Sequence, residues 1–313
     1  MKIALLDAKT LGKDVPYDEK FRKFGELKVY ETTTPEQIIE RAKECDILIS
    51  NKVVINKETM EKCPNLKLIC VTATGINNVD KEHADKKGII VKNAVDYSSN
   101  SVAQVTFTMI LYLLNKPSYY DNYVKSGEYS NTDIFTHLDK PFWQLDGKRL
   151  GIIGLGNIGK TTAKIAEGFG MNICFYSASG KNTHPIYKKV ELDELMSSSD
   201  VIAIHAPLNE KTVNQINYDK IKLMKKTALL INSGRGGIVN EPDLVKALNE
   251  NLIAGAGLDV FQNEPIEKNN PLLSLKDKEK VALFPHIAWS SVEARNLVID
   301  KTCSNISSFL AKE

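Results

Sequence analysis

The chain has 313 residues, of which 42% are hydrophobic and 26% are charged, and its formal net charge is +2. This length is sufficient for two domains with separate cores, and the nearly balanced charge gives no indication of a nucleic-acid partner. The segment Met1–Asp7 becomes acidic too soon for a signal peptide, and no apolar run approaches the length of a membrane span. We therefore expect a cytoplasmic protein without a membrane or nucleic-acid partner.

The cysteines show neither a CxxC pair nor the spacing of zinc ligands. They are Cys45, Cys63, Cys70, Cys174 and Cys303. Their odd number leaves at least one unpaired, and several lie in apolar, strand-like segments. Buried free thiols in a reducing compartment, with no metal site, are the expectation.

The first 97 residues alternate short apolar runs with helical segments. The expected strands are 2–6, 47–50, 67–71 and 89–92, and a helix is expected over 35–45, behind the cap-like Thr34. Fully apolar runs of this length, separated by helices, are typical of a parallel sheet covered on both faces.

A helix is expected after Ser98, because apolar residues recur at helical spacing from Val102 to Leu114. Pro117 should end or kink it. Since this helix is unusually apolar, we expect it to cross between two domains and to leave hydrophobic surface exposed for a partner.

The second part of the chain predicts a second sheet. Its expected strands are 150–153, 172–176, 201–204, 228–232, 254–259 and 281–284. The last helix, 292–310, has no place in a completed nucleotide-binding domain, so it should return to the first domain. We predict an α/β protein with two Rossmann-like parallel-sheet domains. The discontinuous, flavodoxin-like substrate domain comprises 1–97 and 288–313, and the NAD(P)-binding domain comprises 98–287.

A glycine motif marks the start of the second sheet. Gly154, Gly156 and Gly159 lie between the apolar strand 150–153 and a helical segment. In a dinucleotide site the first glycine permits a tight turn, the second lets the backbone approach a pyrophosphate, and the third allows close helix–strand packing. The helix N-terminus then faces the phosphates. An ordinary strand–helix turn is the alternative.

The end of the next strand departs from the usual NAD pattern. An acidic residue is normally found about 20 residues after the first glycine, where it binds the ribose. Here that position is Ser177, and no acidic residue occurs between Glu167 and Glu191. The carboxylate that would repel a 2′-phosphate is missing, and Ser179 and Lys181 could contact one. NADP(H), or both NAD(H) and NADP(H), is therefore expected as cofactor.

Ordered motifs along the whole chain resemble the D-isomer-specific 2-hydroxyacid dehydrogenase family. Besides the glycine motif they are 74–80 (TGINNVD), 101–104 (SVAQ), 205–208 (HAPL), 232–237 (NSGRGG), 257–261 (GLDVF), 264–265 (EP) and 285–286 (PH). Residues 286–289 (HIAW) and 293–295 (EAR) look most like the hydroxypyruvate reductase, or glycerate dehydrogenase, branch. The resemblance implies reduction of a small 2-keto acid to the D-2-hydroxy acid, and the reverse.

The resemblance also implies the catalytic residues. Arg235 follows a strand, and its planar guanidinium can contact a substrate carboxylate and keto oxygen together. His286 matches the family's general acid, and Glu264 matches its carboxylate partner. A carboxylate beside an imidazole stabilises the charged ring and fixes its orientation.

The remaining site residues implied by the resemblance fall into two groups. The expected cofactor-binding residues are Gly154, Gly156, Asn157, Ile158, Gly159, Ser177, His205, Ala206, Pro207, Thr212, Asn232, Ser233, Gly234, Asp259 and Ala288. The expected substrate-binding residues are Asn51, Ala73, Thr74, Gly75 and Trp289. Backbone N–H groups of residues 73–75 would hold the substrate carboxylate.

Several functions stay open within this resemblance. D-lactate dehydrogenase and 3-phosphoglycerate dehydrogenase belong to the same family. A non-catalytic, dinucleotide-sensing scaffold of the C-terminal-binding corepressor type shares the fold. Family precedent and the apolar helix after Ser98 predict a homodimer.

Overall fold

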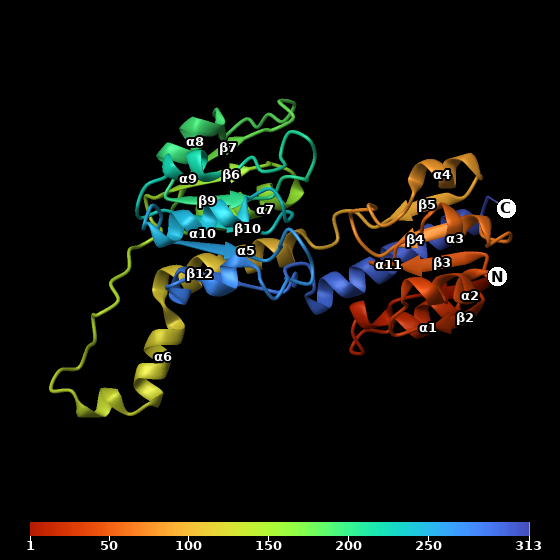
Figure 1. The fold of residues 1–313 in the computed structure, drawn as a ribbon, viewed down its shortest axis with the longest axis horizontal. Coiled ribbons are helices and arrows are strands. Elements are labelled where there is room, and N and C mark those ends of the chain that lie inside the picture. Colours follow the sequence, from red (N-terminus) through yellow and green to blue (C-terminus); the bar gives the residue numbers. More distant parts are fainter. Residues whose placement is uncertain (313) are drawn as a thin grey trace. The chain divides into compact units, whose positions relative to one another are not determined.

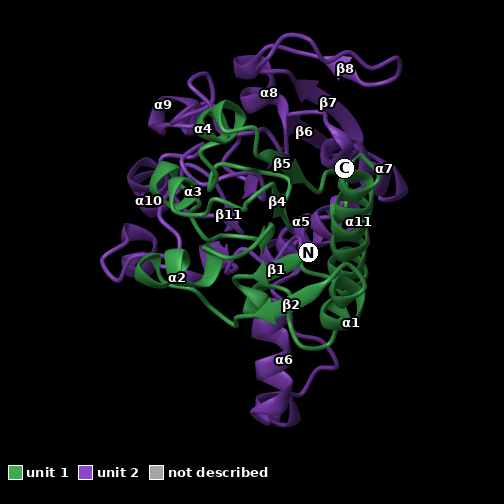
Figure 2. Ribbon diagram, turned by 90° about the vertical axis from the view of Figure 1, so that its right-hand side faces the viewer, with its two compact units in different colours: residues 1–98, 290–313 green, residues 99–289 purple. Residues whose placement is uncertain are grey.

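The computed structural model describes residues 1–312, which form two compact units. The first unit comprises Met1–Ser98 and the segment from Ser290 onward, and the second comprises Ser99–Trp289 (Figure 2). Each unit is built on its own parallel sheet, as expected from the alternation of apolar runs and helical segments.

The first unit contains a five-stranded parallel sheet of order β2-β1-β3-β4-β5. The strands are β1 (Lys2–Leu5), β2 (Glu26–Val29), β3 (Ile47–Ser50), β4 (Leu68–Val71) and β5 (Ile90–Asn93). The helices are α1 (Tyr17–Arg22), α2 (Ile38–Ala42), α3 (Lys57–Glu61), α4 (Lys81–Lys86) and α11 (Val292–Leu310). Apolar residues of α2, α3 and α4 share one core cluster with the strands.

The C-terminal helix α11 belongs to the first unit, as the sequence predicted. It packs against α1 and β4, and the Asn305 side chain donates a hydrogen bond to the carbonyl of Asn93 at 3.0 Å. Ser291 caps its N-terminus by accepting the N–H of Ala294. The first domain is therefore discontinuous in sequence.

The second unit contains a seven-stranded parallel sheet of order β12-β11-β10-β9-β6-β7-β8 (Figure 1). Its strands are β6 (Arg149–Ile153), β7 (Asn172–Tyr176), β8 (Lys188–Lys189), β9 (Val201–Ile204), β10 (Leu229–Asn232), β11 (Gly255–Leu258) and β12 (Val281–Leu283). Its helices are α5 (Ser99–Asn115), α6 (Pro117–Lys125), α7 (Asn157–Gly168), α8 (Leu192–Ser198), α9 (Tyr218–Lys222) and α10 (Glu241–Asn249).

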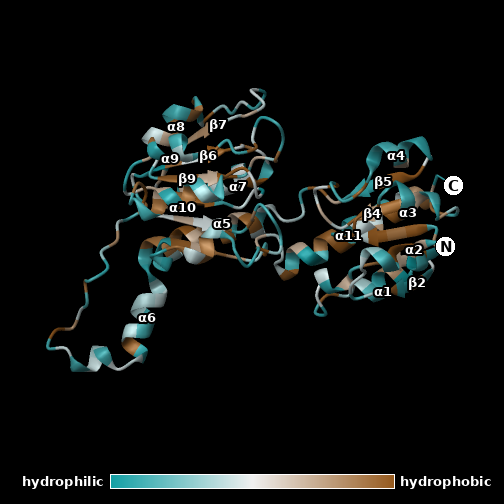
Figure 3. Cartoon of the chain, viewed as in Figure 1, coloured by the Kyte–Doolittle hydropathy of each residue, from teal (hydrophilic) through white to brown (hydrophobic). Residues whose placement is uncertain are grey.

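Helices cover both faces of this second sheet, because successive residues of a strand point to opposite sides. Ile152 and Ile231 share a core with α5 and α7, whereas Ile202 and Leu230 share a core with α8, α9 and α10. The strands are accordingly hydrophobic along their length, and hydrophilic residues lie on the outer helices (Figure 3).

Helix α5 lies wholly in the second unit, and most of its apolar residues are buried there, but Val105 and Leu111 are half-buried and Tyr112 is 37% exposed. Met109, Ile110 and Leu113 pack in a core cluster of this unit, and a Cβ on Gly257 of β11 would lie 2.9 Å from Met109 Cβ. Its own sheet covers one face of the helix, whereas Val105, Leu111 and Tyr112 leave apolar surface uncovered, so the binding of a partner there stays a prediction. The helix ends at Asn115, and Lys116 then takes a left-handed conformation (φ 49°) before Pro117.

The five cysteines are free, and four of them are buried. Burial raises the pKa of the Cys70 thiol to about 12, so this thiol stays protonated and packs as a small apolar group. No helix within residues 1–312 is long and apolar enough to cross a membrane.

Candidate active site

The glycine loop joins β6 to α7, and two of its three glycines are required by packing within the protein. Gly154 has φ +95°, and a Cβ there would lie 2.8 Å from the backbone nitrogen of Ala206. A Cβ on Gly159 would lie 2.4 Å from the carbonyl oxygen of Gly154. These two glycines permit the tight turn and the close helix–strand approach that the motif predicts.

Gly156 differs, because a Cβ there would meet no protein atom within 4 Å. It has φ −84°, which any residue can adopt, and it is the N-cap of α7 without a capping side chain. Neither packing nor backbone conformation therefore requires glycine at this position. Open space over a helix N-terminus is what a phosphate group needs, so the residues present fit a dinucleotide.

Three adjacent strands bring the predicted catalytic residues to one edge of the second sheet. Asn232 of β10 pairs with Leu258 of β11, which pairs in turn with Leu283 of β12. Arg235, Glu264 and His286 each follow the carboxyl end of one of these strands. Ligands of open α/β sheets bind at this edge.

Glu264 and His286 form a hydrogen-bonded pair. The distance between His286 Nδ1 and Glu264 Oε2 is 2.7 Å, and the side chains are 23% and 32% exposed. The other carboxylate oxygen of Glu264 accepts the N–H of Phe261 at 3.1 Å, which fixes the carboxylate. Because Nδ1 faces Glu264, Nε2 is the nitrogen through which the ring can exchange a proton with a bound molecule.

Asp259 holds the turn that carries His286. Its buried carboxylate accepts the N–H of Ile287 at 2.8 Å and the N–H of Ala288 at 2.9 Å. His286 itself has φ 55°, a left-handed conformation that non-glycine residues rarely adopt. Burial raises the pKa of Asp259, whereas the two N–H donors lower it. The carboxylate therefore contributes to keeping His286 in a strained but defined position.

The turn that carries Arg235 is closed by Asn232. The Asn232 side chain accepts the N–H of Gly234 and donates to the carbonyl of Arg235, both at 3.0 Å. A Cβ on Gly236 would lie 1.7 Å from the carbonyl oxygen of Phe261, so this turn packs directly against the turn that holds Glu264. The Arg235 side chain is exposed, and its Nη1 donates to the carbonyl of Gly234 at 2.8 Å.

Ser177 follows β7, where the ribose-binding acid of NAD enzymes is expected. Its buried hydroxyl accepts the N–H of Asn182 at 3.3 Å and lies 3.4 Å from the hydroxyl of Ser179. The N–H of Lys181 donates to the Ser179 hydroxyl at 3.3 Å. This short loop carries hydroxyl groups and a lysine but no carboxylate.

The loop after β9 is closed by Thr212, whose buried hydroxyl donates to the carbonyl of Pro207 at 2.7 Å. His205 lies at the start of this loop, and its ring contacts Ser233 and Thr162. Nothing in the sequence distinguished Thr162, because a threonine on a helix is unremarkable until its partner is known.

The substrate-binding residues predicted in the first unit follow β3 and β4 at the carboxyl edge of its sheet. Asn51 is buried, and its N–H donates to the carboxylate of Asp7, which also accepts the N–H of Lys52 at 2.7 Å. Thr74 is exposed, and its carbonyl accepts the Asn93 side chain at 2.6 Å. Sequence reasoning missed Asp7. The substrate-binding roles of Asn51, Ala73, Thr74, Gly75 and Trp289 stay predictions.

A metal centre is not formed by the described residues. Within residues 1–312, no group of three or more histidine, cysteine, aspartate or glutamate side chains is arranged to hold a metal ion. The side chains that the motifs predict at the carboxyl edge of the second sheet are a guanidinium, an imidazole and a carboxylate.

Comparison with known proteins agrees with this geometry. Residues 107–288 match the model of the D-isomer specific 2-hydroxyacid dehydrogenase, NAD binding domain. The chain is 38% identical to a hydroxypyruvate reductase of Blautia hydrogenotrophica (99% of this chain, 97% of the relative). It is 37% identical to a glycerate dehydrogenase of Methylorubrum extorquens (99% and 96%).

A solved structure has the same fold. It is the NADPH-dependent glyoxylate/hydroxypyruvate reductase of Sinorhizobium meliloti in complex with NADP and malonate. It aligns with a TM-score of 0.81 at 25% identity, covering 99% of this chain and 93% of that one. The chain therefore belongs to the D-isomer-specific 2-hydroxyacid dehydrogenases, a family of NAD-binding oxidoreductases.

Proposed function

We propose that this enzyme reduces a small 2-keto acid, hydroxypyruvate or glyoxylate, to the D-2-hydroxy acid with NAD(P)H, and catalyses the reverse reaction. The observation that carries the proposal is the 2.7 Å contact between Glu264 and His286 at the sheet edge that Arg235 shares. The similarity to a hydroxypyruvate reductase and a glycerate dehydrogenase supports the substrate class.

Each side chain has a role that its geometry supports. The Arg235 guanidinium binds the substrate carboxylate and polarises the keto oxygen. His286 donates the proton on Nε2 to that oxygen as it becomes an alkoxide, and Glu264 orients and stabilises the charged ring. The bound nicotinamide supplies the hydride. The second unit, which carries the glycine loop, is proposed to bind the cofactor.

A panel of keto acids tests this proposal. Hydroxypyruvate, glyoxylate, pyruvate and phosphohydroxypyruvate would each be supplied with NADH and with NADPH, and cofactor oxidation followed at 340 nm. The highest kcat/KM is expected with hydroxypyruvate or glyoxylate. A clear preference for pyruvate or phosphohydroxypyruvate would favour D-lactate or 3-phosphoglycerate dehydrogenase. Negligible turnover of all four would favour a dinucleotide-sensing scaffold.

NADPH is proposed as a good cofactor because of the loop after β7. Ser177, Ser179 and Lys181 offer hydrogen-bond donors and a positive charge to a 2′-phosphate. The S. meliloti relative, which is described as NADPH-dependent, has the same fold. Comparing kcat/KM for the two cofactors checks this. A preference for NADH of about a hundredfold, roughly 2.7 kcal/mol, would contradict the argument.

A homodimer is also proposed, and a projecting arm supports it in addition to the apolar surface of α5. The arm comprises α6, the 3-10 turn Glu128–Asn131 and the loop to residue 143, and it extends away from the sheet of its unit (Figure 1). Phe135 is 89% exposed and Leu138 is 74% exposed. Large apolar side chains on a projecting segment are typical of an interface between subunits.

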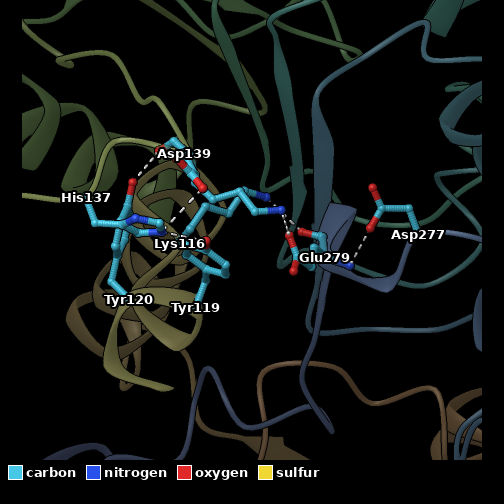
Figure 4. Close-up of polar contacts among 8 residues, drawn as sticks. Lys116, Tyr119, Tyr120, His137, Asp139, Asp277 and Glu279 are labelled. Carbon is cyan, nitrogen blue, oxygen red and sulfur yellow. Dashed lines mark hydrogen bonds and ion pairs between the residues drawn. The ribbon is translucent and has the colours of Figure 1, made fainter. Parts of the chain in front are cut away.

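The arm is fixed by polar contacts at its base (Figure 4). Lys116 Nζ donates to the carbonyl of Glu279 at 2.9 Å, and Lys140 Nζ lies 3.0 Å from the Glu279 carboxylate. Within the arm, the Tyr119 hydroxyl lies 2.7 Å from His137 Nε2. An apolar surface held in a defined position can meet a second copy at little entropic cost.

Sedimentation velocity tests the arm. The wild type should sediment as a dimer at micromolar concentration, and Phe135→Asp should sediment as a monomer. Ile186→Asp is the matched control, because Ile186 is 77% exposed in the same unit but outside the arm. A wild-type monomer, or dissociation by both substitutions alike, would contradict the proposed interface.

A further inference from the structure

We propose that His205 is a positioning residue that couples the cofactor-binding helix α7 to the turn carrying Arg235. The proposal rests on the proposed function only in that Arg235 binds the keto acid. It goes beyond a contact between His205 and the cofactor, because it assigns the ring itself a bridging role between two parts of the site.

The backbone of His205 is fixed by the glycine loop. Its N–H donates to the carbonyl of Ile153, the last residue of β6, at 2.9 Å. A Cβ on Gly154 would lie 3.0 Å from the carbonyl carbon of His205, so the glycine turn packs on this peptide. The starting point and direction of the side chain are therefore set by the same loop that fits the dinucleotide.

The imidazole contacts two elements with its two nitrogens. Nε2 lies 3.0 Å from the hydroxyl of Thr162, which is fully buried on α7. Nδ1 lies 3.2 Å from the hydroxyl of Ser233, two residues before Arg235. One ring thus joins the helix after the glycine loop to the turn of the predicted substrate-binding arginine.

The contacts continue beyond the ring on both sides. The Ser233 hydroxyl lies 2.9 Å from the buried hydroxyl of Thr106 on α5, which lies 2.8 Å from the carbonyl of Val102. The Thr162 hydroxyl lies 3.0 Å from the carbonyl of Ile158. The bridge is therefore a continuous polar chain from α5 through the residues that directly follow β10 and β9 to α7.

The polar chain has one contact more than the hydrogens that a neutral His205 leaves available. It has five links, whereas three hydroxyl groups and a neutral imidazole supply only four hydrogens. With the proton on Nδ1, the link from Thr162 to the Ile158 carbonyl is unfilled. With the proton on Nε2, the link from Thr106 to the Val102 carbonyl is unfilled. Either tautomer fills both links to the ring, and the unfilled link falls at a helical carbonyl.

The charged ring would fill all five links, but burial opposes it. Burial lowers the pKa of His205 to about 4, so the ring is neutral near pH 7. A neutral ring bonded on both sides holds its neighbours in place, and its single N–H is used in this chain and is far too weakly acidic to protonate a keto acid. His205 therefore acts through the positions of Thr162 and Ser233.

Two substitutions separate the two sides of the bridge. An asparagine amide reaches roughly the position of Nδ1, whereas a glutamine amide reaches roughly that of Nε2. His205→Asn keeps the link to Ser233 and loses the link to Thr162. It should raise the Kd of NADPH about three- to tenfold, as expected for one lost hydrogen bond, and leave the KM of hydroxypyruvate nearly unchanged.

His205→Gln should have the opposite effect, raising the KM of hydroxypyruvate and leaving the Kd of NADPH nearly unchanged. Thr106→Val, at the far end of the Ser233 side, should resemble His205→Gln. Thr108→Val is the matched control, because the Thr108 hydroxyl donates to the Gln104 carbonyl of the same helix and contacts no residue of the polar chain within the described part of the protein.

The measurements keep this proposal distinct from the proposed function. NADPH binding is measured by isothermal titration calorimetry without a keto acid, and the Arg235 side is also read from oxalate binding to the NADPH-loaded protein. Opposite effects of the two His205 variants on these Kd values support the bridge even if hydroxypyruvate is not turned over. If both variants change both constants alike, or lower only the melting temperature, His205 is merely structural and the proposal fails.

Discussion

Replacing Gly156 by alanine separates cofactor binding from folding. Gly156 has φ −84°, and a Cβ there would meet no protein atom within 4 Å. Restricting the unfolded chain should stabilise the variant by about 0.4–1 kcal/mol, and the poorer N-cap should cost a similar amount. The free energy of unfolding without cofactor should therefore stay within about 1 kcal/mol of wild type.

Cofactor binding should change much more. The added methyl group occupies the space over the N-terminus of α7 where the pyrophosphate is expected. A tenfold rise in the Kd of NADPH corresponds to about 1.4 kcal/mol, and we expect at least this loss. At an NADPH concentration about one hundred times the wild-type Kd, the stabilisation by ligand should fall from about 2.7 to about 1.4 kcal/mol.

Urea unfolding with and without NADPH measures both effects, and Gly159→Ala provides the contrast. A Cβ on Gly159 would lie 2.4 Å from the backbone oxygen of Gly154, so this variant should lose about 1–3 kcal/mol without any cofactor. The reasoning is refuted if Gly156→Ala binds NADPH and NADH with wild-type Kd values, because the open space would then not receive the phosphates.

Three further predictions concern the same unit. Asp259→Asn replaces the carboxylate that accepts two N–H groups at the turn of His286, so the kcat of hydroxypyruvate reduction, taken from initial rates, should fall about tenfold. An unchanged kcat would contradict this role of Asp259. Ser177→Asp places a carboxylate beside the expected 2′-phosphate, so the NADPH-to-NADH ratio of kcat/KM should fall about tenfold or more, and an unchanged ratio would place the ribose elsewhere. His205 has a folded pKa of about 4 against an ordinary 6.5, so below pH 6.5 protons bind the unfolded chain preferentially; between pH 7 and pH 5 this should lower the free energy of unfolding by at most about 2 kcal/mol. In urea titrations the free energy of unfolding of His205→Gln should not show this part of the decline with falling pH. An equal pH dependence in the wild type and the variant would mean that the His205 ring is not buried in its neutral form.

Much of the fold could be predicted from the sequence, because its central strands are continuous apolar runs. Strands such as 47–50 and 201–204 are fully buried, and their largely apolar composition indicates this burial. The return of α11 to the first unit was predicted from the lack of any remaining partner in the second. The edge strand β2 was missed, since Glu26–Val29 has only four residues and alternates exposed polar with more buried apolar side chains, so it forms no continuous apolar run. Helices of five or six residues are too short for their apolar residues to show a helical period in the sequence.

The candidate active site could be predicted from the sequence only where its residues belong to a recognisable motif. The glycine roles follow from local backbone geometry, so Gly154 and Gly159 behave as the motif implies. The contact between Glu264 and His286 joins residues 22 positions apart and was suggested only by the family resemblance. The role of Asp7 could not be predicted for a different reason: apart from the Ser50 hydroxyl, the partners of its carboxylate are backbone N–H groups, which almost any residue provides.

The same limit applies to the apolar surface of α5. An apolar helix surface looks alike in sequence whether a second subunit or the helix's own sheet covers it. The apolar surface of the arm could not be predicted for the opposite reason. Its exposed apolar side chains, such as Phe135, lie in a segment whose sequence shows no periodic pattern. Only tertiary contacts decide which apolar surface stays uncovered.

The most direct measurement compares the wild type with His286→Gln in the oxidation of NADPH and NADH by hydroxypyruvate, with cofactor Kd values measured alongside. Loss of the proton donor should lower kcat by about 10²–10⁴-fold, and the Kd of either cofactor should stay within about twofold of wild type. A variant that retains the wild-type kcat, or a wild type that oxidises neither cofactor with any keto acid, would contradict catalysis through His286 and its partner Glu264.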